Sequence, residues 1–403
     1  MEKQDLGTVW KDQKQLRRGY TTGSCSAAAA KAAAGMLLGK EELKTVSLKT
    51  PAGLILYLEV EEIQRTAASV SCAIRKDSGD DPDVTNKALV FATVSTDKAE
   101  FLKEKDKTWF EDERGLYLTG GEGVGRVTGK GLEQKPGQAA INRVPRDMIF
   151  SAVAEQKERY HFHEPLYIEI SVPKGAEIAE RTFNPRLGIE GGISILGTSG
   201  IVEPMSEKAL LDTILLEMKM LRDSGHGYCY VVPGNYGSDF LTEQLGYDPA
   251  MAVKCSNYIG DTLDLAVQLG MEGILLVGHI GKLVKVAAGV MNTHSRQADC
   301  RMEVLASHGA MAGLGQEQVK KIMNCITTTE ALEILREAGV LEDVMASVMG
   351  KMEQALIHRA GKKLKLGVIM FSEGEILGKA GKVTEILEEI KREEKLTGKE
   401  ESR

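Results

Sequence analysis

The chain has 403 residues, of which 42% are hydrophobic and 27% charged, with a net charge of −7. These values are typical of a globular protein with two ordinary domains, and the negative charge argues against a nucleic-acid partner. The six cysteines form no metal-ligand spacing, so we expect no metal site. No apolar leader and no apolar run near ~18 residues occurs, which predicts a cytoplasmic chain without a membrane span.

The first half predicts an α+β domain with a mixed sheet. We expect helices at 24–38 and 145–159 and strands at 45–50, 54–60, 68–75, 87–96, 115–132 and 165–173. In the second half strands alternate with helices, which predicts a Rossmann-like parallel sheet in an α/β domain. Its expected segments are 191–202, 206–222, 227–237, 260–270, 273–289, 300–361 and 365–378. We therefore divide the chain into an α+β domain at 1–187, an α/β domain at 188–385 and a charged tail at 386–403.

The stretch RRGYTTGSCSAAAAKAAAG, residues 17–35, places small polar residues at the start of an alanine helix. Three interpretations stay open here. Thr22 or Ser24 caps the helix and nothing more, or the free N–H groups bind an anion together with Arg17 and Arg18, or Cys25 is a reactive thiol whose pKa the helix start lowers. The alanines indicate a helix that packs very closely against another element.

Two further segments of the first half have open interpretations. GGEGVG at 120–125 is followed by Arg126 and Lys130, and it is either a nucleotide-binding loop, a loop in close contact with a ligand, or a glycine-rich hairpin. KDSGDDPDVT at 76–85 crowds four aspartates together. It suits a structural turn, a polar or acid/base role for Asp81 and Asp83, or a cation site, although the EF-hand spacing is absent.

Three glycine loops follow three expected strands of the second half. They are Gly197-Thr198-Ser199-Gly200, Pro233-Gly234-Asn235-Tyr236-Gly237 and Gly278-His279-Ile280-Gly281-Lys282. Ligands of parallel sheets bind at the carboxyl ends of strands, so these loops predict a cofactor site, with ordinary βα turns as the alternative. His279 lies in one of the loops and is a candidate acid/base group or a structural histidine.

The ordered set of motifs resembles the cobalt-precorrin-5B C1-methyltransferase family of anaerobic cobalamin (vitamin B12) biosynthesis. The resemblance rests on RRGYTTGSCSAAAAKAA, KDSGDDPDVT, GGEGVGRVTGKGL, AINRVPRDMI, FNPRLGIEGGISILGTSGIVEPMS, GNYG and VGHIGKLVKVAAGVMNTHSRQAD, and it spans about 16–380. TGKGL departs from the expected Thr-Lys-Pro-Gly-Leu. The resemblance implies an enzyme that transfers a methyl group from S-adenosyl-L-methionine to C1 of a cobalt-containing tetrapyrrole, giving cobalt-precorrin-6A.

Under this hypothesis the chain needs no metal of its own, because the cobalt belongs to the substrate. We expect the cofactor at Gly197, Thr198, Ser199, Gly234, Asn235, Asp261, Gly278 and Gly281. We expect the carboxylates of the macrocycle at Arg17, Arg18, Thr21, Thr22, Ser24, Arg126, Lys130, Arg143 and Arg146. Asp81, Asp83 and His279 are candidates for managing the proton balance at C1. Transient contacts with neighbouring pathway enzymes are a further expectation.

Two other functions remain as alternatives. A dinucleotide-dependent oxidoreductase would use the glycine loops but needs a complete GxGxxG between strand and helix, which no segment provides. A tetrapyrrole carrier would bind the macrocycle without a small cofactor.

Overall fold

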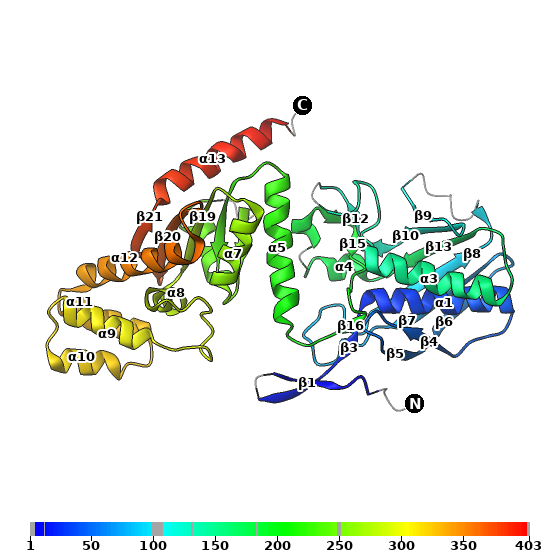
Figure 1. Ribbon diagram of the computed structural model, residues 1–403, viewed down its shortest axis with the longest axis horizontal. Coiled ribbons are helices and arrows are strands. Elements are labelled where there is room, and N and C mark those ends of the chain that lie inside the picture. Colours follow the sequence, from blue (N-terminus) through cyan, green and yellow to red (C-terminus); the bar gives the residue numbers. More distant parts are fainter. Residues whose placement is uncertain are drawn as a thin grey trace. The chain divides into compact units, whose positions relative to one another are not determined.

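The computed structural model describes residues 5–11, 13–98, 108–129, 132–182, 184–247 and 251–400. The chain forms two compact units, Met1–Ser206 (unit 1) and Glu207–Arg403 (unit 2), whose elements are labelled in Figure 1. The predicted boundary between 187 and 188 differs from this division, because the segment that follows it pairs with strands of unit 1.

Unit 1 contains a six-stranded mixed sheet in the order β6-β7-β8-β13-β10-β9, in which only β13 and β10 run parallel. Its strands are β6 (Glu61–Arg65), β7 (Ser69–Arg75), β8 (Leu89–Ser95), β9 (Phe110–Asp112), β10 (Leu116–Gly120) and β13 (Leu166–Ser171). β7, β8 and β13 agree with the strands expected at 68–75, 87–96 and 165–173. The mixed sheet predicted for the first half is therefore present.

Short strand pairs surround this sheet. They are β1 (Thr8–Lys11) with β2 (Lys14–Arg17), β3 (Gly19–Tyr20) with β16 (Ile201–Val202), β4 (Thr45–Lys49) with β5 (Ile55–Glu59), β11 (Gly123–Val124) with β15 (Gly192–Ile193), and β12 (Arg126–Val127) with β14 (Ile189–Glu190). A short helix α4 (Gly175–Ala179) and a 3-10 turn η1 (Asn184–Leu187) complete the unit. Because β14, β15 and β16 bind strands of unit 1, residues 188–206 belong to it.

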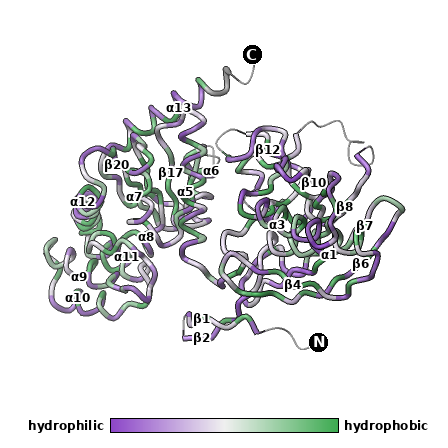
Figure 2. Tube along the Cα trace, turned by 45° about the vertical axis from the view of Figure 1, so that its right-hand side comes forward, coloured by the Kyte–Doolittle hydropathy of each residue, from purple (hydrophilic) through white to green (hydrophobic). Residues whose placement is uncertain are grey.

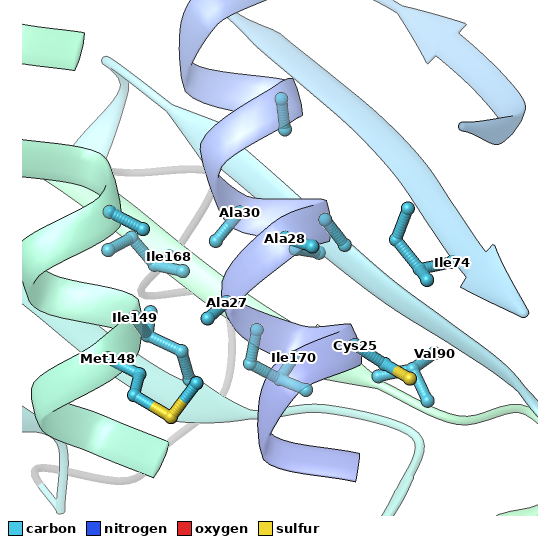
Figure 3. Packing of buried hydrophobic residues seen from close by; sticks show 14 of the residues in the cluster. Cys25, Ala27, Ala28, Ala30, Ile74, Val90, Met148, Ile149, Ile168 and Ile170 are labelled. Carbon is cyan, nitrogen blue, oxygen red and sulfur yellow. The ribbon is translucent and has the colours of Figure 1, made fainter. Parts of the chain in front are cut away.

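Two long helices, α1 (Thr22–Gly39) and α3 (Arg143–Arg159), pack together on the sheet. Figure 3 shows the alanines of α1 among Ile149 of α3 and isoleucines of β13. The helix is buried on nearly all sides, so its alanines have no exposed surface. A Cβ on Gly23 would lie 2.8 Å from Pro145 Cγ, and one on Gly39 would lie 2.4 Å from the Tyr160 hydroxyl. The expected close packing of this helix is confirmed.

The glycine-rich segment 120–125 opens no helix. Gly123 lies in β11 with a φ of +71°, and a Cβ there would approach the Val172 carbonyl oxygen to 1.8 Å. Cβ atoms on Gly175 and Gly192 would come within 1.9 and 2.2 Å of the Gly123 carbonyl oxygen. Three backbone segments therefore meet here, and the glycines allow contact within the chain. This contradicts the nucleotide-loop interpretation of 120–125.

Unit 2 is built on a five-stranded sheet in the order β18-β17-β19-β20-β21. Its strands are β17 (Tyr228–Val232), β18 (Ala252–Lys254), β19 (Gly273–His279), β20 (Lys365–Ser372) and β21 (Glu375–Gly381). The first four in spatial order are parallel, and β21 is an antiparallel edge. The sequence did not predict β18 or β21. The expected strand at 191–202 lies in unit 1 instead, as the short strands β15 and β16.

Helices cover both faces of this sheet. They are α5 (Glu207–Asp223), α6 (Asn235–Glu243), α7 (Ile259–Leu269), α8 (Ile280–Leu283), α9 (Arg301–Met311), α10 (Gln316–Met323), α11 (Thr328–Glu337), α12 (Leu341–Ala360) and α13 (Val383–Glu400), with a 3-10 turn η3 (Val284–Ala288). α6 and α13 pack on one face, whereas α5, α7 and α12 belong to the core on the other.

The segment predicted as a charged tail at 386–403 begins inside a packed helix. Ile386 and Ile390 of α13 are fully buried against the sheet. Their four-residue spacing puts both on one face, and Figure 2 shows the alternation of apolar and polar residues along α13. The first residues of this segment are therefore part of the core of unit 2 and not a separate charged tail.

Candidate functional site

The carboxyl ends of β17 and β19 form the place in unit 2 where the strand order reverses. From β17 the chain adds β18 on one side and then β19 on the other side. Loops that leave such neighbouring strands diverge, and ligands of open α/β sheets bind between them. The loop with Gly234 and Asn235 follows β17, and the loop with Gly281 follows β19. We call this region the switch point.

A lysine joins the loops at the switch point. The Lys282 ammonium donates to the Pro233 carbonyl oxygen at 2.7 Å and to the Ser256 carbonyl oxygen at 3.5 Å. It thereby connects the loops after β17 and β18 to α8. Burial lowers the pKa of Lys282. A second lysine, Lys254, donates to the Asn235 side-chain oxygen at 3.0 Å.

His279 is the last residue of β19 and the N-cap of α8. Its Nδ1 accepts a hydrogen bond from the Gly281 backbone N–H at 3.1 Å. The imidazole lies 5.8 Å from the Phe371 ring of β20 and 6.3 Å from the Tyr236 ring of α6, measured between centroids. Burial lowers the pKa of His279, while the charge of Glu373 acts in the opposite direction. Burial therefore favours the neutral form of the ring.

The predicted glycines of these loops have different roles. A Cβ on Gly234 would have no atom within 4 Å, so this backbone borders open space. A Cβ on Gly278 would approach the Leu283 side chain and Pro233 Cδ to 3.1 Å, and one on Gly281 would lie 3.2 Å from His279 Nδ1. Gly278 and Gly281 are thus explained by contacts inside the chain. Of the three, Gly234 is the one that leaves room for a ligand.

Asp261, also expected at the cofactor, lies in the first turn of α7 after β18. Because α7 follows β18, Asp261 lies at the carboxyl edge of the sheet, which is also the edge of the switch point. The remaining predicted cofactor residues, Gly197, Thr198 and Ser199, belong to unit 1. The three loops thus do not follow three strands of one sheet.

The 197–200 loop surrounds the start of α1. Gly197 has a φ of +134°, and a Cβ there would lie 2.3 Å from the Thr21 hydroxyl. The Gly200 carbonyl oxygen accepts from the Thr21 backbone N–H at 3.1 Å and from the Ser24 hydroxyl at 2.7 Å. The Ser199 carbonyl oxygen accepts from Ala52 N–H at 3.0 Å, while Thr198 is exposed. The loop is therefore fastened to unit 1.

The first turn of α1 uses its donors within the chain. Thr21 is the N-cap and accepts from Ser24 N–H at 3.2 Å, and Gly23 N–H donates to the Leu196 carbonyl oxygen at 3.0 Å. The Thr22 hydroxyl exchanges hydrogen bonds with the Leu196 backbone. Thr21, Thr22 and Ser24 are all buried. Of the three interpretations of this stretch, the geometry favours capping.

The reactive-cysteine interpretation is wrong. Cys25 has no exposed surface, and burial raises the pKa of its thiol to about 12. The helix start does not lower it, because desolvation of the thiolate outweighs the helix dipole and the nearby charge of Lys76.

Arg17 and Arg18 pair with carboxylates of unit 1. The Arg17 guanidinium binds both oxygens of Asp77 at 2.9 and 2.8 Å, and its backbone N–H donates to Asp80 at 2.6 Å. Arg18 lies 3.0 Å from Glu203. The Arg17 contacts join β2 to the aspartate-rich segment, whereas Arg18 joins the N-terminal strands to the segment after β16.

Asp81 and Asp83 hold the aspartate-rich turn in place. The Asp81 carboxylate accepts from Met205 N–H at 2.9 Å. Asp83 pairs with the buried Lys76 ammonium and accepts from Thr85 N–H at 2.7 Å. Burial would raise the pKa of Asp83, but the charge and hydrogen bonds of Lys76 and Thr85 lower it overall. The geometry favours the structural-turn interpretation of 76–85.

The remaining basic residues lie elsewhere in unit 1. Arg126 donates to the Gly120 carbonyl oxygen at 2.8 Å, and Arg146 pairs with Glu133 at 2.5 Å. Arg143, in the first turn of α3, keeps 76% of its side chain exposed and stands 3.9 Å from Asp147. Lys130 lies outside the described residues.

Two cavities lie away from every predicted site residue. One, of about 360 Å³, is lined by Arg114, Lys157, His161 and His163 in unit 1. The other, of about 660 Å³, lies between α12 and β21 in unit 2. Among the described residues, no group of histidine, cysteine or acidic side chains has the arrangement of a metal site. Within the same residues, no helix combines the length and apolar character that a membrane span requires.

Comparison with known proteins supplies the relationship. Family models described as CbiD and as CbiD, C-terminal domain match residues 9–204 and 292–381. A cobalt-precorrin-5B C(1)-methyltransferase of Ruminiclostridium cellulolyticum is 47% identical over 91% of both chains. The chain belongs to the CbiD family. A relative of the same name from Alkaliphilus metalliredigens is 44% identical over 96% of this chain and 98% of its own.

The CbiD relatives include a solved structure. A crystal structure of the cobalamin biosynthesis protein cbiD from Archaeoglobus fulgidus is 27% identical, covers 73% of this chain and 87% of that one, and gives a TM-score of 0.38. The first CbiD model ends at residue 204, next to the boundary between the units after Ser206. The switch-point loops lie between the two matched ranges, in a part of the chain that the full-length relatives cover.

Sequence reasoning missed two side chains at the switch point as site candidates. Lys254 ends β18, a strand that was not predicted. Phe371 meets His279 only because β20 pairs with β19, and strand order is not visible in a single sequence. Tyr236, which is 79% exposed, lies two residues after Gly234, inside a loop that the sequence had already indicated for the cofactor.

Proposed function

We propose that this CbiD protein transfers a methyl group from S-adenosyl-L-methionine to C1 of cobalt-precorrin-5B, giving cobalt-precorrin-6A. The observation that carries the proposal is 47% identity over 91% of the chain to a relative named for this activity. The match to both CbiD family models supports it. A cytoplasmic location and transient contacts with neighbouring pathway enzymes remain predictions.

The cofactor belongs, in this proposal, at the switch point of a Rossmann-like unit 2. Gly234 leaves open space beside the backbone, which suits close approach of a nucleoside. Lys254 supplies a positive charge for the carboxylate of the methionine part, and Asn235 keeps its amide N–H groups as donors. When bound, S-adenosyl-L-methionine supplies an activated methyl group on a sulfonium. The residues of the chain then need to orient the two reactants and exclude water.

The macrocycle meets basic residues of unit 1. We place Arg143 first among them, because its exposed guanidinium has one distant partner, Asp147, and such surface pairs contribute little. The half-exposed Leu196 packs at the start of α1, next to α3, and offers an apolar contact for the ring. Arg126 and Arg146 remain secondary candidates. Arg17, Arg18, Thr21, Thr22 and Ser24 serve the fold instead, as their internal partners indicate.

The chain's catalytic contribution is alignment rather than proton transfer. Holding donor and acceptor in reacting geometry is worth roughly 7–11 kcal/mol in favourable cases. Asp81 and Asp83 are occupied by internal partners, so we assign neither of them to C1.

The experiment is a turnover assay with S-adenosyl-L-methionine carrying a ¹³C-methyl group and purified cobalt-precorrin-5B. The expected result is one labelled methyl per macrocycle, placed at C1 by NMR, together with S-adenosylhomocysteine. Binding of the macrocycle without transfer would support the carrier alternative. Transfer to a different ring carbon would overturn the proposed substrate position.

A further inference from the structure

The two nitrogens of His279 have different environments. Nδ1 accepts the Gly281 backbone N–H, so this nitrogen carries no proton. In the neutral ring the proton therefore resides on Nε2, because the bond at one nitrogen fixes the tautomer of the other. Among the described residues of the chain, no acceptor contacts Nε2. The neutral side chain thus has one group left for a ligand, and that group is a donor.

The surroundings keep the ring in this neutral state. Burial lowers the pKa of His279, and the carboxylate that faces it is Glu373, in the turn between β20 and β21. The rings of Phe371 and Tyr236 pack on it from β20 and α6, and Lys282 is the charged residue of its own helix. A general base would have to bind a proton at Nδ1, where the lone pair already holds the start of α8.

We infer that His279 is a hydrogen-bond donor, through Nε2–H, to the nucleoside half of the bound cofactor, and that it does not act as the general base. The inference rests on the proposed function. The nucleoside half is favoured because adenine and ribose carry neutral acceptors and because the aromatic rings of Tyr236 and Phe371 flank the imidazole. The charged amino-acid half suits Lys254 instead.

Two variants separate the nitrogens of His279. His279→Asn keeps an oxygen that can accept from Gly281 N–H, since Asn is a favoured N-cap, but it removes the Nε2 donor. His279→Gln loses the cap and keeps an N–H near the Nε2 position. Calorimetric titration of the full-length variants with S-adenosylhomocysteine measures the affinity of each. We expect His279→Asn to weaken binding roughly tenfold, the loss of one buried hydrogen bond, and His279→Gln to stay within about threefold of the unmodified chain.

His294 provides the matched control. Its Nδ1 also accepts the backbone N–H two residues ahead, from Arg296 at 3.2 Å. His294→Asn should leave the affinity for S-adenosylhomocysteine unchanged. The tenfold loss in His279→Asn should recur with 5′-methylthioadenosine, which has no amino-acid half.

The outcomes distinguish the inference from the proposed function. If the unmodified chain does not bind S-adenosylhomocysteine, the cofactor placement and the donor role both fail. If it binds and His279→Asn binds equally well, only the donor role is overturned. A general base would give a different pattern. In that case His279→Asn would keep its affinity for S-adenosylhomocysteine but lose turnover, and the turnover of the unmodified chain would rise with pH through a histidine-like pKa. That pattern would overturn the donor role.

Discussion

The start of α1 in unit 1 and the switch point in unit 2 are built from similar small polar residues but use their polar groups differently. At the start of α1, the N–H groups of Gly23 and Ser24 and the hydroxyl of Thr22 all have partners inside the chain. At the switch point, Gly234 borders open space, and among the described residues no acceptor contacts the Nε2 atom of His279. A polar turn is thus a ligand site only where folding leaves its donors and acceptors unused.

The largest expected effect comes from breaking the internal pairing of unit 1. Lys76→Met removes the buried ammonium and leaves the Asp83 carboxylate partly buried without its partner. We expect a loss of about 3 kcal/mol in the free energy of unfolding, the low end for a buried ion pair, because Asp83 keeps some exposure. Urea unfolding measures it. The exposed Lys49→Met is the control, and a loss no larger than the control's would contradict the structural role.

The same pair predicts a pH dependence. The pKa of Asp83 is lower in the folded chain than in the unfolded chain, so its contribution is present above the unfolded pKa. It is lost as pH falls through the folded pKa. The difference in stability between the unmodified chain and Lys76→Met should therefore shrink in acid. A difference that stays constant from neutral to acid pH would show that Asp83 is not the partner that matters.

At the switch point, Lys282→Met should weaken cofactor binding. The substitution removes the ammonium that joins the Pro233 and Ser256 carbonyl oxygens, so the loops after β17 and β18 lose their shared contact. We expect roughly a tenfold weaker affinity for S-adenosylhomocysteine, measured by calorimetry, because the site is less preorganised. The exposed Lys320→Met on α10 is the control. Equal affinities would show that the loops need no such link.

Gly23→Ala tests the close approach of α1 and α3. The new Cβ would lie 2.8 Å from the rigid Pro145 ring. Overpacking costs typically 1–3 kcal/mol, and the better helix propensity of Ala offsets up to ~1 kcal/mol, so we expect a net loss near 1 kcal/mol. Thermal unfolding measures it, with Gly350→Ala as the control, since a Cβ there meets no atom within 4 Å. A stabilised Gly23→Ala variant would contradict the packing account of α1.

Arg143→Ala should have the smallest effect on stability, because the side chain is exposed. If Arg143 holds a carboxylate of the macrocycle, the variant raises the KM for the macrocycle roughly tenfold and leaves the affinity for S-adenosylhomocysteine unchanged. Steady-state kinetics and calorimetry separate the two. An unchanged KM would show that the macrocycle does not contact the first turn of α3.

Much of the fold was predictable from the sequence because it depends on local patterns. α1, α3, β7, β8 and β13 lie where periodicity and breaker residues placed them. The unit boundary was not predictable, since residues 188–206 belong to unit 1 through two-residue pairings with distant strands.

The candidate site was predictable only in part, for a related reason. The sequence shows that Gly234 and His279 end strands, but it does not show that β17 and β19 are neighbours at the point where the strand order reverses. It shows Arg17 and, about sixty residues later, a run of aspartates, without showing that the Arg17 guanidinium pairs with Asp77. Partner choice of this kind is a long-range property of the fold.

The most direct test is hydrogen exchange of the full chain, followed by mass spectrometry, with and without saturating S-adenosylhomocysteine. The account predicts slower exchange in peptides covering 233–236, 254–258 and 279–282, and no change at 21–26. Protection centred on 21–26 and 196–200 would contradict it, because the start of α1 would then be the cofactor site.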